Sequence, residues 1–81
     1  MGEISEEPAV VVDAKGLVCP MPIIKAKKGI DGVQVGQVME LLATDPGSMA
    51  DFKAWTKSTG HELLEARDDG GTFTYLIRRT K

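Results

Sequence analysis

The sequence predicts an α/β fold: a two-layer α/β sandwich in which a four-stranded mixed sheet packs against two helices, in the order β-α-β-α-β-β. Short apolar runs that suit strands alternate with two segments in which apolar residues recur at helical spacing. The chain then ends in two strand-like segments joined by a glycine-rich turn, and such a hairpin is antiparallel. Helices and strands in this order favour a sheet covered by helices.

The N-terminal half supplies a tail, one strand and one helix. Residues 1–8 are acidic and predict a flexible tail, and residues 9–81 predict a single domain. The β-branched run within Ala9–Asp13 suits a buried strand. A helix opens at Pro20, because proline is tolerated in the first helical turn. The apolar stripe of this helix consists of Ile23, Ala26 and Ile30, and the opposite face carries Met21, Lys25 and Lys28. Gly29 and Gly32 lie near the end of the helix.

The middle of the chain supplies a second strand and a second helix. Val38–Thr44 is short and mostly apolar, which indicates a central strand. Gly60 is suited to end the helix that follows. The buried face of that helix carries Met49, Phe52 and Trp55. The helix start has two alternative caps, Asp45 with Pro46 in the first position or Ser48 with Asp51 in the reciprocal role.

The C-terminal part predicts a hairpin. His61–Arg67 is a third strand, Asp68-Asp69-Gly70-Gly71 is the turn, and Thr72–Arg78 is the fourth strand. The last strand alternates cleanly, so that one face is apolar and the other is not: Phe73, Tyr75 and Ile77 against Thr72, Thr74 and Arg78.

Composition limits the function classes. A chain of 81 residues buries only about 60% of the surface that its unfolded form exposes, and an apolar content of 42% is adequate for one compact core. The net charge of −2 predicts no direct binding of nucleic acid, and no apolar run approaches the roughly 20 residues that span a bilayer. Met1–Pro8 lacks the apolar segment of a secretion signal, and a single unpaired cysteine fits a reducing compartment, so we expect a cytoplasmic protein.

The single cysteine, Cys19, lies in the tetrapeptide Cys19-Pro20-Met21-Pro22, directly before the first predicted helix. A helix N-terminus favours the thiolate, which is the reactive form, and a residue that precedes proline suits the N-cap position. Pro20 and Pro22 have no N–H, so only Met21 is left to donate to the sulfur. We therefore expect a rigidly held and moderately activated thiol. Positive potential could come from Lys15, Lys25 or Lys28.

One sulfur restricts the chemistry that the site can perform. Dithiol redox chemistry needs a second cysteine, and a Cys/His zinc site needs four ligands where this chain offers Cys19 and His61. We expect neither a metal nor a cofactor. Three roles remain for Cys19: a nucleophile, a partner in mixed disulfides, or a carrier of a second sulfur as a persulfide. An arbitrary lone cysteine is more often a small buried hydrophobe, but the position before a proline-opened helix favours function.

Three segments and one tryptophan carry a family resemblance. They are Asp13–Pro22, which contains the Cys-Pro-x-Pro element, Thr44–Ser48, Gly60–Leu64 and Trp55. In these features the chain from about Val11 to Arg79 resembles the TusA-like (SirA-like) family of sulfur carriers. Lys15 departs from the arginine of many members, which keeps the charge but loses a bidentate contact.

The resemblance implies the same β-α-β-α-β-β sandwich and a sulfurtransferase-type carrier, in which Cys19 accepts sulfane sulfur as a persulfide and hands it on. The implied donors are cysteine desulfurases or rhodaneses, and the implied acceptors are DsrE-type sulfurtransferases or similar proteins. The pathways of the family include tRNA thiolation, sulfur oxidation and cofactor sulfuration, and some members are tied to selenium. Besides Cys19, the predicted active-site loop and helix start comprise Lys15, Gly16, Pro20, Met21 and Pro22. The alternative is a non-catalytic regulatory or protein-interaction module with a structural Cys19.

Other residues allow two interpretations each. His61 is expected to be a structural residue at a strand start rather than an acid or base, because no second catalytic group accompanies it. Asp45 is expected to cap a helix; it would reach Cys19 only if the two helix starts lie side by side. Trp55 is expected to pack on its helix. Lys25, Lys27 and Lys28 are expected to form a solvent-exposed face of the helix rather than a binding surface for an acidic partner.

Overall fold

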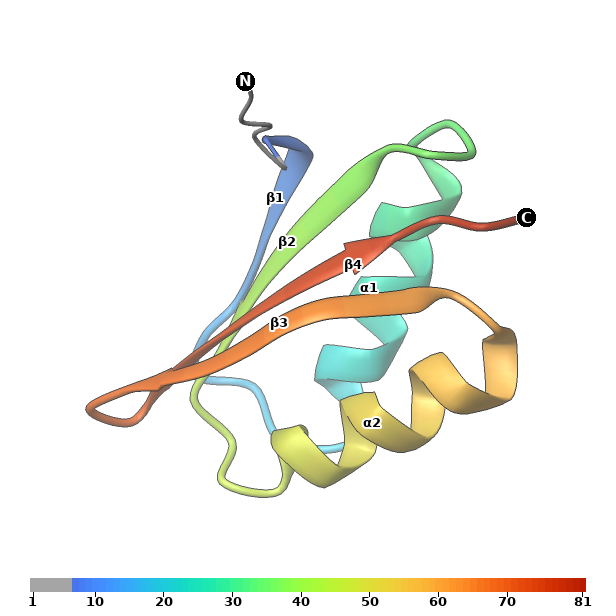
Figure 1. The fold of residues 1–81 in the computed structure, drawn as a ribbon. Coiled ribbons are helices and arrows are strands. Elements are labelled where there is room, and N and C mark those ends of the chain that lie inside the picture. The colour runs from blue at the N-terminus through green and yellow to red at the C-terminus, as the bar shows by residue number, and fades with distance from the viewer. Residues whose placement is uncertain (1–6) are drawn as a thin grey trace.

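The computed structural model describes residues 7–81 as a sheet with both helices on one face (Figure 1). Its elements are β1 (Pro8–Ala14), α1 (Met21–Asp31), β2 (Val38–Ala43), α2 (Ser48–Thr59), β3 (Glu62–Asp69) and β4 (Thr72–Arg78). α1 packs against β1 and β2, α2 packs against β3 and β4, and the two helices touch. The predicted fold class and element order are confirmed. The predicted tail falls largely on residues 1–6, which lie outside the described residues, and Pro8 already begins β1.

The strand order is β1-β2-β4-β3, with β1 parallel to β2 and the other two pairs antiparallel. The sheet is therefore mixed, as predicted. Gly70 and Gly71 alone form the β3–β4 turn, with φ angles of 71° and 102°. Positive φ at both central residues suits a two-residue hairpin turn. Asp68 and Asp69 pair with β4 instead of entering the turn, so the third strand is longer than expected.

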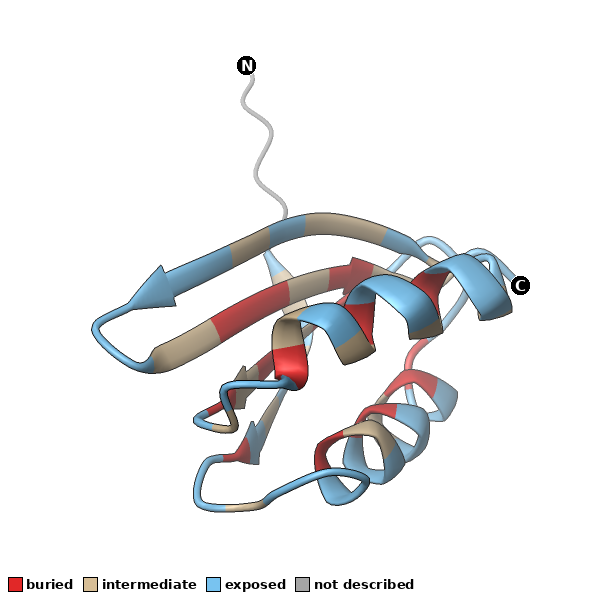
Figure 2. Cartoon of the chain, turned by 90° about the horizontal axis from the view of Figure 1, so that it is seen from below, coloured by how far each residue is buried: buried red, intermediate tan, exposed pale blue. Residues whose placement is uncertain are grey.

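The core lies between the sheet and the helices, and its buried residues come mainly from both helices and from β1, β2 and β4 (Figure 2). Tyr75 and Ile77 are buried on β4, as the alternation predicts, and Tyr75 stacks on Phe52 with ring centroids 4.6 Å apart. The Tyr75 hydroxyl and Ser48 Oγ form a buried hydrogen bond of 2.6 Å. Both polar groups are satisfied inside the core, and the first residue of α2 is tied to the sheet.

α1 begins one residue later than the sequence predicts. Pro20 is the N-cap residue and makes no side-chain cap, and Cys19, joined to it by a cis peptide bond, precedes the cap. Pro22 occupies the second helical position and is buried with Ala26 and Ile30 of the predicted apolar stripe, whereas Ile23, the third residue of that stripe, is half-buried. The stripe sits on β1 and β2 and orients the whole helix.

Gly29 lies inside α1 and not at its end. A Cβ atom at this position would lie 2.6 Å from Val12 Cγ2 and 2.7 Å from Met39 Sδ, and both distances are too short for a real contact. The absence of a side chain therefore lets α1 approach β1 and β2 closely. Gly32 ends the helix as its C-cap, as expected.

Neither predicted cap starts α2. The helix begins at Ser48 with Gly47 as its N-cap, and no side chain caps it. Ser48 turns inward to Tyr75, and Asp45 Oδ1 accepts the Gly47 N–H at 3.1 Å within the preceding loop. The other end agrees with the prediction, since Gly60 takes the left-handed conformation with a φ of 85°. The predicted apolar face is confirmed, with one buried and two half-buried residues: Phe52, Met49 and Trp55.

Candidate functional site around Cys19

The site lies at the edge of the sheet where β1 and β2 end. Because these strands are parallel neighbours, the loops that follow them leave the same edge and meet. Gly16 N–H donates to Thr44 Oγ1 at 2.9 Å, and Cys19 N–H donates to Asp45 Oδ2 at 3.0 Å. The two helix starts therefore lie side by side, and the Thr44-Asp45 pair holds the cysteine loop. For Asp45, the contact with Cys19 is the interpretation that the structure supports, and helix capping is wrong.

Cys19 lies at an exposed tip. Its side chain is exposed, and its neighbours Val18 and Met21 have exposed fractions of 67% and 41%. This excludes the interpretation of Cys19 as a small buried hydrophobe. Of the other predicted site residues, Lys15, Gly16 and Pro20 share the exposed loop, and Pro22 lies on the buried face of α1.

The backbone amides at the start of α1 are already occupied. Met21 N–H, which was the expected donor to the sulfur, donates to the Val18 carbonyl at 2.9 Å. Ile23 N–H donates to the Pro20 carbonyl at 3.1 Å. Cys19 is also one residue further from the helix than the N-cap position that the sequence predicts. The start of α1 therefore activates the thiol less than expected.

The charges that act on the thiol are negative. A hydrogen bond to the Asp51 side chain, then partial desolvation, then the negative charges of Asp51 and Asp45 raise the pKa of Cys19 above its ordinary value. Among the described residues, no lysine contributes to this shift, although we expected Lys15, Lys25 or Lys28 to add positive potential. The prediction of a moderately activated thiol is therefore wrong. With a raised pKa, the free protein holds Cys19 mainly as the neutral thiol at neutral pH.

The α1 side of the site is apolar and basic. Met21 and Ile24 lie one turn apart on the outer surface of α1, next to Val18. Ile24 has an exposed fraction of 42%, and Lys25 and Lys28 are exposed on the same helix. We call these five residues the α1 patch. Cys19 thus adjoins a basic, apolar patch on one helix and two carboxylates from the β2–α2 side.

His61 is not part of this site. It follows the end of α2, whereas the cysteine loop is bonded to the segment before α2, and the 12 residues of that helix span about 18 Å. His61 Nδ1 accepts the Thr80 N–H at 3.2 Å, and the ring contacts Trp55 at a centroid distance of 5.8 Å. Burial, followed by the positive charges of Arg79 and Lys81, lowers the pKa of His61. These contacts agree with a structural role.

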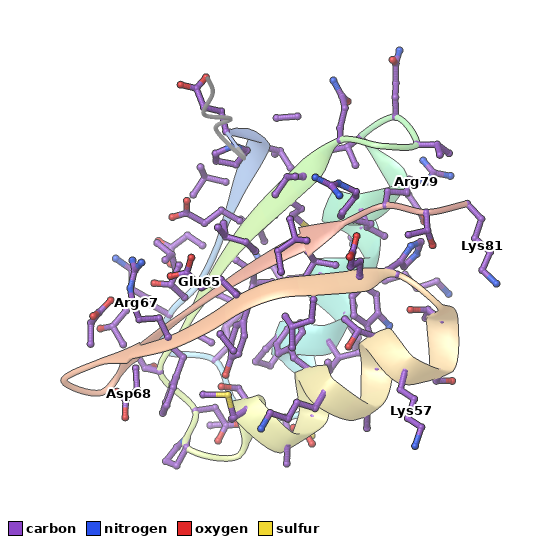
Figure 3. All side chains as sticks on the ribbon, in the orientation of Figure 1. Lys57, Glu65, Arg67, Asp68, Arg79 and Lys81 are labelled. Atoms are coloured by element: carbon purple, nitrogen blue, oxygen red, sulfur yellow. The ribbon has the colours of Figure 1, made fainter. Side chains whose placement is uncertain are left out.

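The arginines labelled in Figure 3 also have structural partners. Arg79 lies beside the end of α1, where its Nη1 donates to the Val33 carbonyl at 2.6 Å. Arg67 on β3 pairs with Glu65 and Asp69, each at 2.7 Å. The Arg67 pairs are about half exposed and contribute little to stability. Neither arginine belongs to the Cys19 site.

Residues 7–81 contain no cavity and no cluster of His, Cys, Asp and Glu side chains that could hold a metal ion. Among the helices described, none combines the length and apolar character needed to cross a membrane. The described site is therefore an exposed sulfur on a surface and not a pocket.

Sequence reasoning did not assign Thr44 or Asp51 to the site. The signal that could have found them is topological. The Thr44-Asp45 pair directly follows β2, and the cysteine loop directly follows β1. Adjacent parallel strands place such loops at one edge of the sheet, where sites in α/β proteins form. Recognising β1 and β2 as a parallel pair would have brought these residues together.

The fold and site define a class: a small two-layer α/β domain that presents one sulfur at the edge of its sheet, on a loop that ends in a proline before α1. Comparison with known proteins identifies the family. The family model described as sulfurtransferase TusA matches residues 10–79. The chain belongs to this TusA family.

The chain is similar to relatives in several bacteria. It is 49% identical over 69 residues to the sulfur carrier protein TusA of Allochromatium vinosum, covering 85% of this chain and 91% of that protein. It is 38% identical over 72 residues to the sulfur carrier protein TusA of Pseudomonas putida, covering 89% and 90%. The crystal structure of a SirA-like protein from Desulfitobacterium hafniense superposes with a TM-score of 0.75 at 27% identity, covering 89% of this chain and 99% of that one.

Proposed function

We propose that this protein is a sulfur carrier in which Cys19 accepts sulfane sulfur as a persulfide from a donor protein and relays it to an acceptor protein. The observation that carries the proposal is an exposed single cysteine on an anchored loop, in a chain whose relatives are named sulfur carrier proteins. A structural role for Cys19 is disfavoured by the same exposure.

The loading step needs one reactive cysteine on each protein. The Cys19 thiolate attacks the terminal sulfur of a cysteine persulfide on the donor, which forms a new S–S bond. The S–S bond of the donor breaks, and its electron pair leaves with the donor cysteine as a thiolate. That thiolate takes the proton that Cys19 gave up. The products are a donor thiol and a Cys19 persulfide, with no net oxidation, and delivery to the acceptor repeats the same exchange.

The surroundings of the sulfur suit transfer between proteins. A substrate pocket is not needed, because the partner brings the reacting sulfur. The α1 patch offers apolar side chains and lysines that suit a partner with an apolar centre and an acidic rim. We propose a cysteine desulfurase or a rhodanese as donor and a DsrE-type sulfurtransferase or a similar protein as acceptor, in the cytoplasm. The pathway served would be tRNA thiolation, sulfur oxidation or cofactor sulfuration.

The test is loading in vitro. The protein is incubated with a cysteine desulfurase and cysteine, and its intact mass is measured without reductant. We expect a gain of one sulfur atom that is absent in Cys19→Ser and is removed by reduction. The absence of an adduct with a desulfurase, a rhodanese and inorganic polysulfide would refute the proposal.

A further inference from the structure

Two carboxylates are held beside Cys19. Asp45 is fixed by two backbone amides, because Oδ2 accepts the Cys19 N–H at 3.0 Å and Oδ1 accepts the Gly47 N–H at 3.1 Å. Asp51 lies in the first turn of α2 and is half-buried. Ser48, one turn earlier, is bonded to Tyr75 in the core, so the helix start that carries Asp51 cannot move freely. The negative charge beside the sulfur is therefore built into the fold.

We propose that Asp45 and Asp51 restrain the reactivity of Cys19 in the free protein, and that the sulfur donor lifts this restraint by placing a cationic side chain against the two carboxylates. The inference rests on the proposed function, since it concerns the regulation of the same sulfur. Beyond the role of Cys19 itself, the inference assigns a function to Asp45 and Asp51 and a positive charge to the docking surface of the donor.

The restraint acts through the protonation of the thiol. A carboxylate that accepts a hydrogen bond from a thiol stabilises the protonated form, and a second negative charge nearby opposes ionisation. The Asp45 carboxylate lies against the Cys19 amide, with Oδ2 3.0 Å from the nitrogen. The raised pKa of Cys19, with the Asp51 side chain as its first cause and the charges of Asp51 and Asp45 after desolvation, agrees with this position. Only the thiolate attacks a persulfide or disulfide. The free carrier is therefore slow to react with stray disulfides and oxidants.

Docking supplies the missing positive charge. An arginine or lysine of the donor within about 4–6 Å of the carboxylates would neutralise them and favour the thiolate. Acidic side chains of the same donor would meet Lys25 and Lys28 of the α1 patch. A donor with this pattern of charges binds in one orientation, because the reversed orientation places like charges together. Reactivity and correct docking are thus coupled at one site.

The restraint is tested without any sulfur donor. The rate at which Cys19 reacts with dithiodipyridine, an uncharged disulfide, is measured against pH for the wild type, Asp45→Asn, Asp51→Asn and the double variant. The wild-type midpoint should lie above the ordinary thiol value of about 8.5. Removing the charges should lower the midpoint. Each unit by which the thiol pKa is lowered raises the thiolate fraction at neutral pH about tenfold. The reaction rate rises only about threefold, because the intrinsic nucleophilicity of a thiolate falls as its pKa falls.

Asp31→Asn is the matched control. It removes the same charge from the far end of α1, where Asp31 is exposed, and the thiol midpoint should not change. Circular dichroism and thermal melts show whether each variant is folded. The comparison of the wild-type midpoint with the ordinary thiol value does not depend on any variant. A wild-type midpoint at or below about 8.5, or a folded double variant whose midpoint equals that of the wild type, would overturn the restraint.

The donor half is tested by the rate of persulfide formation with a cysteine desulfurase. The double variant should react faster than the wild type with dithiodipyridine, yet load more slowly from the desulfurase, because it has lost the ionic contact. Faster loading from the desulfurase would overturn the cationic contact. If the wild type forms no persulfide with any donor, the proposed function and the donor half fail together, while the disulfide assay still decides the restraint.

Discussion

The buried hydrogen bond between Tyr75 and Ser48 should be worth a measurable part of the stability. The two oxygens lie 2.6 Å apart, and the residues are 0% and 1% exposed. Tyr75→Phe keeps the ring that stacks on Phe52 but leaves the Ser48 hydroxyl buried without this partner. Such an unsatisfied group costs about 1–3 kcal/mol. For a domain of this size, each kcal/mol corresponds to a fall in Tm of roughly 4–8 °C.

A double-mutant cycle separates the hydrogen bond from other effects. Ser48→Ala should cost a similar amount, because it leaves the Tyr75 hydroxyl unpaired. The double variant removes both polar groups and should be much more stable than the sum of the single losses predicts, with a coupling energy of about 1 kcal/mol or more. Urea unfolding measures all four chains, and Ser58→Ala, at an exposed position on α2, is a control expected to stay within about 0.5 kcal/mol. Additive losses, or a Tyr75→Phe chain as stable as the wild type, would show that this hydrogen bond does not stabilise the fold.

Three further perturbations address packing, pH and docking. Gly29→Ala should leave the Tm unchanged or lower it, because the new methyl group meets β1 and β2 at a cost of about 1–3 kcal/mol, against a helix-propensity gain of about 1 kcal/mol; a raised Tm would contradict the close approach. His61 has a lowered pKa when folded, so its contribution is complete above about pH 6.5 and is lost as the pH falls below that value. Thermal melts at several pH values should show this loss, and His61→Asn should reduce it; equal slopes in both chains would count against the effect of burial and of the Arg79 and Lys81 charges on His61. Lys25→Glu combined with Lys28→Glu should slow sulfur loading from a protein donor without changing the reaction with dithiodipyridine, and equal loading rates would exclude these lysines from docking.

The sequence predicts the fold well because the relevant signals are local. Alternation over Thr72–Arg78 gives β4 with its exact bounds, and Gly60 ends α2 because only the local backbone decides that position. The helix starts are predicted less well. Asp45 and Ser48 are both good caps in isolation, but each makes a contact with a residue more than 25 positions away, Cys19 and Tyr75. Tertiary contacts therefore override local capping preference at α2.

In the candidate site, too, local features are predicted from the sequence and features set by tertiary contacts are not. The position and exposure of the cysteine loop follow from the motif itself. The state of the thiol does not, because Asp45 and Asp51 act on it only after β1 and β2 pair and bring the cysteine loop beside the segment that starts α2. The expected donor, Met21 N–H, is lost to a turn within the loop. Sequence reasoning therefore predicts where the sulfur is but not how reactive it is.

The most direct test of Cys19 as the sulfur carrier site is to locate the transferred sulfur. After loading by a cysteine desulfurase, the protein is trapped with iodoacetamide, digested, and analysed by tandem mass spectrometry of the peptide that contains Cys19. We expect one additional sulfur on Cys19, absent after reduction and absent in Cys19→Ser. An unmodified Cys19 in a protein that has gained sulfur elsewhere, or no gain with any donor, would contradict this role of Cys19.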